Sequence, residues 1–323
     1  MVVTFAAGQS KVGTTSAPFL GIGVGPRSVG MGGGAVAVVT DVSTMLINPG
    51  IISRLDGGQT MFAKTNWLVD TNINFAAAVI RINRSGTFGI YLLQVDYGRE
   101  EITDLYNQNG TGLYYNASDI VTGLAYSQNL TNQFSIGGTI KFISQQIHNV
   151  HASTVAADVG LLYKSVNDAY RIGMSISNFG SDMIMDGKDL LRKIDLDSES
   201  EGHNETIVAK LKTDAWPLPL FFRVGVSSDL IKSSTMRLTL AADSFIPSDD
   251  VETVRLGLET AFMERVFLRG GYSALGNSQS EEGLALGAGV RVYSGGFTVS
   301  LDYAIQDFGM FEPVSHWGIV INF

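Results

Sequence analysis

The stretch "GGFTVSLDYAIQ" (residues 295–306) alternates apolar side chains with polar or small ones. Its apolar face consists of Phe297, Val299, Leu301, Tyr303 and Ile305. The opposite face includes Asp302, flanked by small residues. A period of two predicts a β-strand, and a tilted strand of about ten residues is long enough to cross a bilayer.

The same alternation recurs along the chain from residue 58 to its end. It predicts about fourteen strands of roughly ten residues, which is the pattern of a transmembrane β-barrel. The predicted strands are 58–66, 72–83, 86–95, 118–129, 133–147, 154–164, 170–178, 219–228, 235–244, 252–263, 265–274, 281–293, 295–306 and 315–323.

The connections between these strands fall into two classes. Tight turns are predicted at 83–86, 129–133, 165–168, 262–265 and 293–296. Long polar connections are predicted near 98–117 and 179–217. Short turns on one rim and long extracellular loops on the other are typical of an outer-membrane barrel.

The non-apolar strand faces carry charges interleaved with glycines. In a membrane barrel these faces line the lumen and the apolar faces contact lipid, because a charge facing lipid at mid-bilayer costs about 2–4 kcal/mol. A soluble β-protein with solvated outer faces is the alternative interpretation. The predicted lumen charges are Asp158, Arg171, Arg223, Arg237, Asp243, Arg255, Glu259, Arg269, Arg291 and Asp302.

Several aromatic residues lie towards predicted strand ends, where girdles of rings settle at the two lipid–water interfaces. These residues are Tyr91, Tyr97, Tyr126, Tyr163, Trp216, Phe262, Tyr272, Tyr293, Tyr303 and Trp317.

The composition excludes several classes of protein. The chain is 45% apolar and 16% charged, which excludes a disordered protein, and no linker divides it into domains. Its net charge of −9 without a basic cluster argues against a nucleic-acid partner. No apolar run is long enough for a transmembrane helix. Residues 1–8 resemble the end of a signal peptide, and an ordinary frayed terminus is the alternative.

No pattern in the sequence predicts an enzyme, a cofactor or a metal site. The glycine-rich stretch 21–50 contains a loose dinucleotide-binding fingerprint, but no βαβ unit surrounds it. His148 and His151 lack the carboxylates that would complete a metal site. No G-x-S-x-G elbow is present, and the sequence contains no cysteine.

The block "GVGPRSVGMGGGAVAVVTDVSTMLINPGIISRL" (residues 23–55) resembles the N-terminal signature of PorV/PorQ-type outer-membrane proteins, a branch of the FadL-like barrels. The segment "WPLPLFFRVGVSSDL" (residues 216–230) resembles a second block of that group. The terminal aromatic residue matches the usual end of outer-membrane barrels. One departure is Gly34, which stands as an extra residue before the alanine of the motif.

This resemblance implies a fourteen-stranded barrel in the bacterial outer membrane. Residues 9–57 would fold inside as a plug or hatch, and residues 58–323 would form the barrel. The plug motif would consist of Arg27, Gly30, Met31, Gly32, Gly33, Asp41, Asn48, Pro49 and Gly50. We expect Arg27 and Asp41 to pair with lumen charges such as Asp302 or Arg291. The C-terminal residues for the barrel assembly machinery would be Trp317, Ile319, Ile321 and Phe323.

Three functions fit such a barrel, and none is enzymatic. The PorV resemblance implies a cargo-binding or assembly component of type IX protein secretion, with a translocon subunit and secreted proteins as partners. The FadL likeness implies a channel that admits a hydrophobic ligand through a gated opening. A structural anchor for surface assemblies is the third. Outer-membrane lipid surrounds the barrel in each case.

Overall fold

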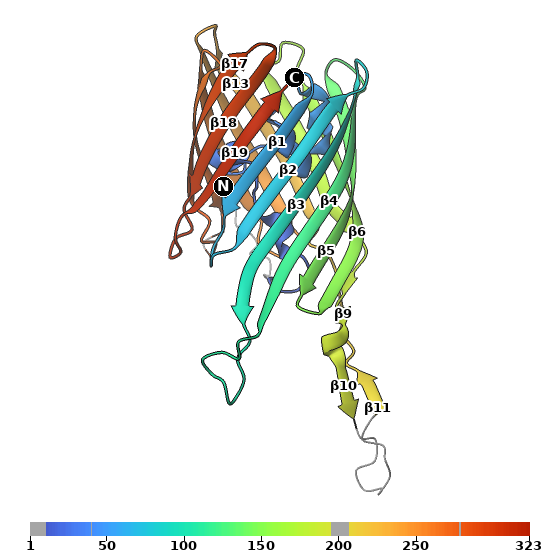
Figure 1. Cartoon of the computed structure of the whole chain (residues 1–323). Helices are drawn as coiled ribbons and strands as arrows, with labels where there is room; N and C mark the ends of the chain where they lie inside the picture. The colour runs from blue at the N-terminus through green and yellow to red at the C-terminus, as the bar shows by residue number, and fades with distance from the viewer. Residues whose placement is uncertain (1–10, 40, 195–206, 278) are drawn as a thin grey trace, which may run out of the picture.

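The computed structural model describes residues 11–39, 41–194, 207–277 and 279–323. Fourteen antiparallel strands form a closed barrel, joined at one edge by the two-residue β9 (Figure 1). The barrel strands are β1 (Gln59–Asn66), β2 (Asn72–Arg81), β3 (Gly86–Glu101), β4 (Tyr114–Asn129), β5 (Phe134–Ile147), β6 (Val150–Lys164), β7 (Tyr170–Gly180), β13 (Phe221–Lys232), β14 (Met236–Pro247), β15 (Thr253–Phe262), β16 (Val266–Leu275), β17 (Leu284–Ser294), β18 (Phe297–Gln306) and β19 (Val314–Asn322). The predicted all-β barrel is therefore confirmed.

The first and last strands close the barrel. β1 pairs antiparallel with β19 along its whole length, from Gln59 opposite Asn322 to Asn66 opposite Ser315. Every other barrel strand pairs with two neighbours, and β5 with β6 completes the ring. Closure matters because an unpaired backbone amide in hydrocarbon has no water to bond.

The two rims of the barrel differ. The turn rim holds the connections 82–85, 130–133, 165–169, 233–235, 263–265 and 295–296 together with the C-terminus, at the top of Figure 1. The loop rim, at the bottom of that view, holds the other connections, which include the two longest and the two-residue turn 148–149. By the usual rule for bacterial barrels, the turn rim faces the periplasm and the loop rim faces the outside.

Both long connections lie on the loop rim, but their bounds differ from the prediction near 98–117 and 179–217. β3 continues to Glu101 and β4 starts at Tyr114, so the first connection is only 102–113. The second runs from 181 to 220 and forms β8 (Met183–Ile184), β9 (Asp186–Gly187), η4 (Lys188–Leu190), β10 (Leu191–Ile194), β11 (Ile207–Lys210) and β12 (Ala215–Trp216). Paired backbone in β10 and β11 makes it a projecting hairpin.

The outer surface of the barrel is apolar. Exposed fractions of 58% for Leu301, 67% for Ile140 and 63% for Leu124 are typical of its outward-facing side chains. Each is followed in its strand by an inward-facing residue, for example Asp302 after Leu301, which is 7% exposed. A monomer in water does not tolerate so continuous an apolar surface, whereas lipid solvates it.

Residues 11–58, called the N-terminal segment below, precede the barrel and contain four short helices. They are η1 (Pro18–Gly21), α1 (Pro26–Gly30), η2 (Val42–Leu46) and η3 (Pro49–Arg54). These helices contact the inner faces of β3–β6 and β16–β19, so the segment lies inside the ring of strands (Figure 1). No helix in the described residues is long and apolar enough to span a membrane. The predicted signal-peptide remnant, residues 1–8, lies outside the described residues.

The outer face predicts how the barrel responds to a misplaced charge. Leu301 and Phe297 lie on the same face of β18 with similar exposed fractions, 58% and 56%, at mid-strand and at the turn rim. We expect Leu301→Arg to destabilise the barrel by about 2–4 kcal/mol, and Phe297→Arg by about 0–1 kcal/mol, because the cost depends on depth. Equilibrium unfolding by denaturant in phospholipid vesicles measures both. Equal losses would contradict a lipid-facing belt on β18.

Candidate functional site: the N-terminal segment in the lumen

The N-terminal segment crosses the lumen from one rim to the other. At the loop rim, the backbone N–H of Ser16 donates to the carbonyl of Pro217 at 2.9 Å. At the turn rim, the guanidinium of Arg54 donates to the carbonyls of Thr131 and Asn132 at 2.9 and 2.8 Å. The described part of the chain between these anchors therefore lies across the lumen of the barrel.

Asp41 and Asn48 begin two of the short helices. The Asp41 carboxylate accepts a hydrogen bond from the N–H of Ser43 at 2.9 Å, and the Asn48 side-chain oxygen accepts one from the N–H of Gly50 at 3.0 Å. Both are N-caps, which satisfy amides that a short helix leaves unpaired. Pro49 then occupies the first position of η3, where a missing N–H costs nothing.

Asn48 also fastens the segment to the barrel wall. It is fully buried, and its side-chain amide donates to the carbonyls of Val36 and Leu161 at 2.8 and 2.9 Å. One bond closes a loop within the segment and the other reaches β6. The Asn-Pro-Gly sequence therefore caps a helix and attaches it to a strand.

Glycines of the motif permit close backbone approach to the wall. A Cβ on Gly32, which has φ of +63°, would lie 2.5 Å from the backbone nitrogen of Tyr272. A Cβ on Gly50 would lie 2.6 Å from the carbonyl oxygen of Gly160. Any side chain at either position would push the segment off the wall. Close packing on the wall also holds for Gly30, Met31 and Gly33.

Arg27 makes the strongest contact between the segment and the barrel. Its guanidinium donates to both carboxylate oxygens of Glu259, at 2.8 and 2.7 Å, with both side chains buried. Glu259 also accepts from Arg269 at 2.8 Å and Arg237 at 2.9 Å, and Arg269 reaches Asp302 at 2.6 Å. Bidentate, charge-assisted bonds of this kind are strong and geometrically specific.

Arg27 pairs with one of the predicted lumen charges, but not with either of the two named as examples, and Asp41 pairs with neither of them. Arg27 binds Glu259 rather than Asp302, and Asp41 uses its carboxylate to cap η2 rather than to bind Arg291. Arg291 instead donates to Ser300 at 3.1 Å. Glu259 is the partner because it lies opposite Arg269 in the register of β15 and β16. Its carboxylate is therefore already fixed towards the barrel axis.

An aromatic ring supports this charge cluster. Phe267 is 1% exposed and points into the lumen from β16. The guanidinium groups of Arg27, Arg269 and Arg291 lie 5.6, 5.3 and 4.8 Å from its ring centroid. Guanidinium groups bind favourably against an aromatic face, so the ring helps to hold three like charges in one region.

The predicted lumen charges are unevenly distributed around the barrel. All but Asp158 lie on β7 and β13–β18. The inner faces of β1–β4 are mainly apolar instead, and with parts of β5 and β6 they form what we call the apolar wall. Its larger members are Met61, Ile73, Phe75, Val79, Leu93, Val95, Val121 and Ile143. The expectation that aliphatic side chains face lipid alone was therefore wrong for this half of the barrel.

Tyr91 is the clearest exception among the predicted girdle aromatics. It is 2% exposed and packs inside the lumen against Phe75, with ring centroids 6.2 Å apart. Trp317 by contrast faces outward with 56% exposure, 4.4 Å from the ring centroid of Tyr303.

The C-terminal residues lie on β19 or directly after it. Trp317, Ile319 and Ile321 share its outward face, and the backbone of Phe323 exchanges two hydrogen bonds of 2.9 Å with Gly58. These bonds bring the end of the chain to the start of the barrel. The role of this end in barrel assembly remains a prediction.

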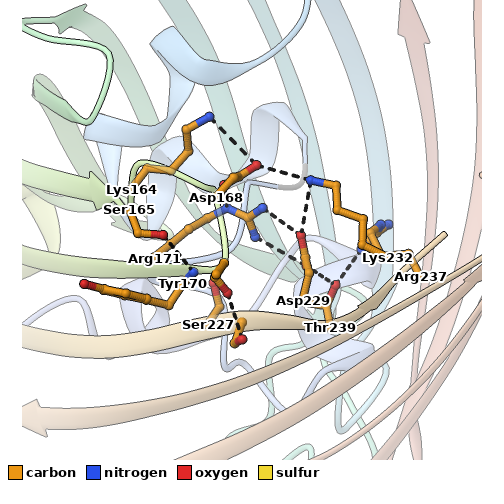
Figure 2. A network of polar contacts seen from close by, with 12 residues as sticks. Lys164, Ser165, Asp168, Tyr170, Arg171, Ser227, Asp229, Lys232, Arg237 and Thr239 are labelled. Carbon is orange, nitrogen blue, oxygen red and sulfur yellow. Dashed lines mark hydrogen bonds and ion pairs between the residues drawn. The ribbon is translucent and has the colours of Figure 1, made fainter.

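A polar cavity of about 460 Å³ opens near the turn rim. Figure 2 shows the network beside it, in which Arg171 bonds Asp229 at 2.8 Å and Asp168 at 3.0 Å. Burial alone would raise the pKa of Asp168, but the hydrogen bond and charge of Arg171, with the charges of Lys164 and Lys232, outweigh burial and lower it. A carboxylate with a lowered pKa stabilises the fold at neutral pH, and this contribution is lost as pH falls through that pKa.

Sequence reasoning missed Lys141 and Asp229, and both had a readable signal. Lys141 lies between outward-facing Ile140 and Phe142 in β5, so strict alternation puts it in the lumen, where it binds Asp158 at 2.7 Å. The same alternation in β13 places Asp229 on the lumen face. In the described residues, no group of three or more His, Asp or Glu is placed to hold a metal ion.

The Arg27–Glu259 contact yields a test of how the segment is held. Arg27→Glu places a second carboxylate against a buried one, so we expect amide exchange in residues 26–34 to accelerate by about 100-fold or more. Arg54→Glu is the matched control, because its partners are exposed carbonyls at the turn rim. Hydrogen-exchange mass spectrometry of the detergent-solubilised barrel measures both. Unchanged exchange at 26–34 in Arg27→Glu would show that this contact does not hold the segment.

Solved outer-membrane channels share this fold over nearly the whole chain. The CymD monoaromatic hydrocarbon channel aligns with a TM-score of 0.58 and 14% identity, covering 93% of this chain and 96% of that one. The toluene transporter TodX of P. putida gives 0.57 and 12%, covering 93% and 99%. A Pseudomonas aeruginosa FadL homologue gives 0.51 and 13%, covering 92% and 96%. No protein-family model and no curated protein matches the sequence.

Likeness at 12–14% identity establishes the fold and leaves the PorV/PorQ branch a prediction. The apolar outer surface and the closed strand ring agree with a position in the outer membrane, where such barrels are found. The chain therefore has the fold of FadL-like channels and is a β-barrel of the bacterial outer membrane.

Proposed function

We propose that this barrel is a non-enzymatic channel that admits hydrophobic small molecules across the outer membrane. The apolar wall is the observation that carries this proposal. A general porin keeps its lumen polar and water-filled, whereas here Phe75, Val95 and Ile143 point inward with exposed fractions of 2%, 1% and 0%. A continuous apolar surface inside the lumen offers a hydrophobic solute a path out of water.

The N-terminal segment covers that surface. Val42, Met45 and Ile52 pack into the same apolar cluster as the wall. A solute therefore reaches the wall only when part of the segment moves, and the buried Arg27–Glu259 contact holds the opposite side of the segment in place. The apolar contacts are non-directional and re-form with a hydrophobic solute, so this side of the segment is the one that we expect to yield.

The structural neighbours support the proposal. CymD is described as a monoaromatic hydrocarbon channel and TodX as a toluene transporter, and both align over more than nine-tenths of this chain. By that analogy we propose small apolar or aromatic molecules as the solutes. Fold analogy alone does not choose a solute, and the apolar wall is the independent physical reason for this class.

Solute uptake into proteoliposomes tests the channel. We expect wild-type barrel to accelerate entry of toluene over protein-free vesicles, and Ile143→Asn on the apolar wall to reduce that rate by about tenfold, because an amide there must be desolvated. Thr239→Asn is the matched control, since Thr239 is 1% exposed on the charged side. Toluene entry at the protein-free rate with wild-type barrel would refute the proposal.

A second candidate function is protein docking at the loop rim, as the type IX secretion reading requires. The specific observation is exposed apolar surface on the connections: Leu105, Tyr106 and Leu113 in the 102–113 loop are 80%, 91% and 66% exposed. The β10–β11 hairpin projects from the same rim and carries Val208 with 59% exposure (Figure 1). Apolar side chains held outside the membrane are typical of a protein-binding surface.

Affinity purification from solubilised outer membranes tests the second candidate. We expect a translocon subunit or secreted protein to co-purify with wild type, and the double variant Leu105→Ser/Tyr106→Ser to lose most of it. Val166→Ser is the control, because Val166 is equally exposed, at 86%, on the turn rim. Equal recovery of the partner with the wild type, the double variant and the control variant would exclude docking through the 102–113 loop. The structural-anchor reading stays a prediction of the sequence.

A further inference from the structure

A small enclosed cavity of about 70 Å³ lies between the N-terminal segment and the barrel wall. The segment contributes apolar side chains such as Ile22 and Val24. The wall contributes two guanidinium groups, Arg223 from β13 and Arg255 from β15, and the phenol of Tyr91 from β3. Leu93 and Val121 of the barrel and Ser28 and Ser43 of the segment line it as well, so its charged groups are the two guanidinium groups.

Arg223 is buried, and none of the residues that the structure describes forms an ion pair with it. It is 7% exposed, and its one hydrogen bond among the described residues is a long one, 3.3 Å, to the hydroxyl of Ser177. Its guanidinium lies against Phe221 and Phe245, at 5.0 and 4.8 Å from the ring centroids. A guanidinium has five N–H donors, so most of those of Arg223 have no acceptor in the part of the chain that the structure describes.

Arg255 lies on the same ring. Its guanidinium is 4.1 Å from the ring centroid of Phe245, and its buried Nε has no hydrogen-bond partner in the described part of the chain. The hydroxyl of Tyr91 is buried and also lacks a partner there. Three residues with unsatisfied donors therefore line one cavity, which is rare, because buried polar groups are almost always bonded.

Among the described residues, the arginines at the cavity are not paired with carboxylates, whereas those around Glu259 are. Each arginine there has a carboxylate within 2.6–2.9 Å. Around the cavity, Asp158 is taken by Lys141, and Asp243 accepts the backbone N–H of Val36 at 2.8 Å without an ion pair within 4.0 Å among the described residues. Three cations, Lys141 and the two arginines, therefore face two carboxylates, Asp158 and Asp243. The two arginines also repel each other. A buried unneutralised charge is costly, so one added anion would stabilise this region.

We propose that Arg223 and Arg255 form a binding site for a compact oxyanion, namely a carboxylate or phosphate group. The cavity volume suits such a group, two guanidinium forks supply its donors, and Phe245 orients both arginines. Because the N-terminal segment forms most of the remaining lining, the bound anion also stabilises that segment in place. The site does not depend on the proposed transport of hydrophobic molecules.

Thermal unfolding of the detergent-solubilised barrel tests the site. Sodium formate or inorganic phosphate replaces sodium chloride at constant ionic strength, and circular dichroism follows unfolding. We expect a saturable rise in the wild-type midpoint. Arg255→Gln should weaken the apparent affinity by about tenfold or more, because a charge-assisted bond is lost. Arg223→Gln, which removes the other guanidinium, is a second variant in case Arg255→Gln fails to fold.

Arg265→Gln is the matched control, since Arg265 is exposed at the turn rim and lies beside Tyr293. It should keep the wild-type response. A second arm compares octanoate with octanol, which share a tail. A response to octanoate and not octanol identifies the carboxylate of an amphiphile as a ligand, and a response to formate or phosphate alone identifies a free anion. No anion-dependent rise in wild type, or a rise in Arg255→Gln and Arg223→Gln equal to that of wild type, would overturn the site whatever the toluene assay gives.

Discussion

Closure of the strand ring is the constraint on which the rest of this structure depends. Lipid offers no partner for a backbone amide, so β1 must pair with β19 along its full length. That pairing brings Gly58 to the terminal Phe323, and with it the N-terminal segment to the turn rim. From there the segment runs through the lumen, where its short capped helices satisfy amides of their own.

The lumen that closure creates has two unlike halves. On β13–β18, Glu259 gathers Arg27, Arg237 and Arg269 into a directional, bidentate contact with fixed geometry. On β1–β6, the segment meets aliphatic side chains whose contacts have no preferred direction. A plug held by specific bonds on one side and by exchangeable apolar contacts on the other is suited to yield on the apolar side. A solute that replaces those contacts need not break the buried charge cluster.

Strict alternation made most of the fold predictable. Residues such as Leu301 and Asp302 occupy opposite faces of β18 because the strand period is two, and closure cannot change that. The same rule would have found Lys141 and Asp229, which the sequence reading passed over. It could not decide that Tyr91 lies inside, since both faces of β3 carry large apolar side chains, Leu92 on one and Leu93 on the other. Nor could it choose between Glu259 and Asp302 for Arg27, because that depends on which strands the segment crosses.

The sequence by itself determined the strands, their two faces, the turns and the presence of a glycine-rich segment with capping residues, because each of these is a local property of neighbouring residues. Tertiary structure alone decided that Arg223 and Arg255 share one cavity with Tyr91, and that the lumen has an apolar wall. Both features depend on strands that lie far apart in the chain. The distances between these strands are fixed only when the ring closes around the N-terminal segment. Long-range proximity, unlike alternation, leaves no period in a sequence.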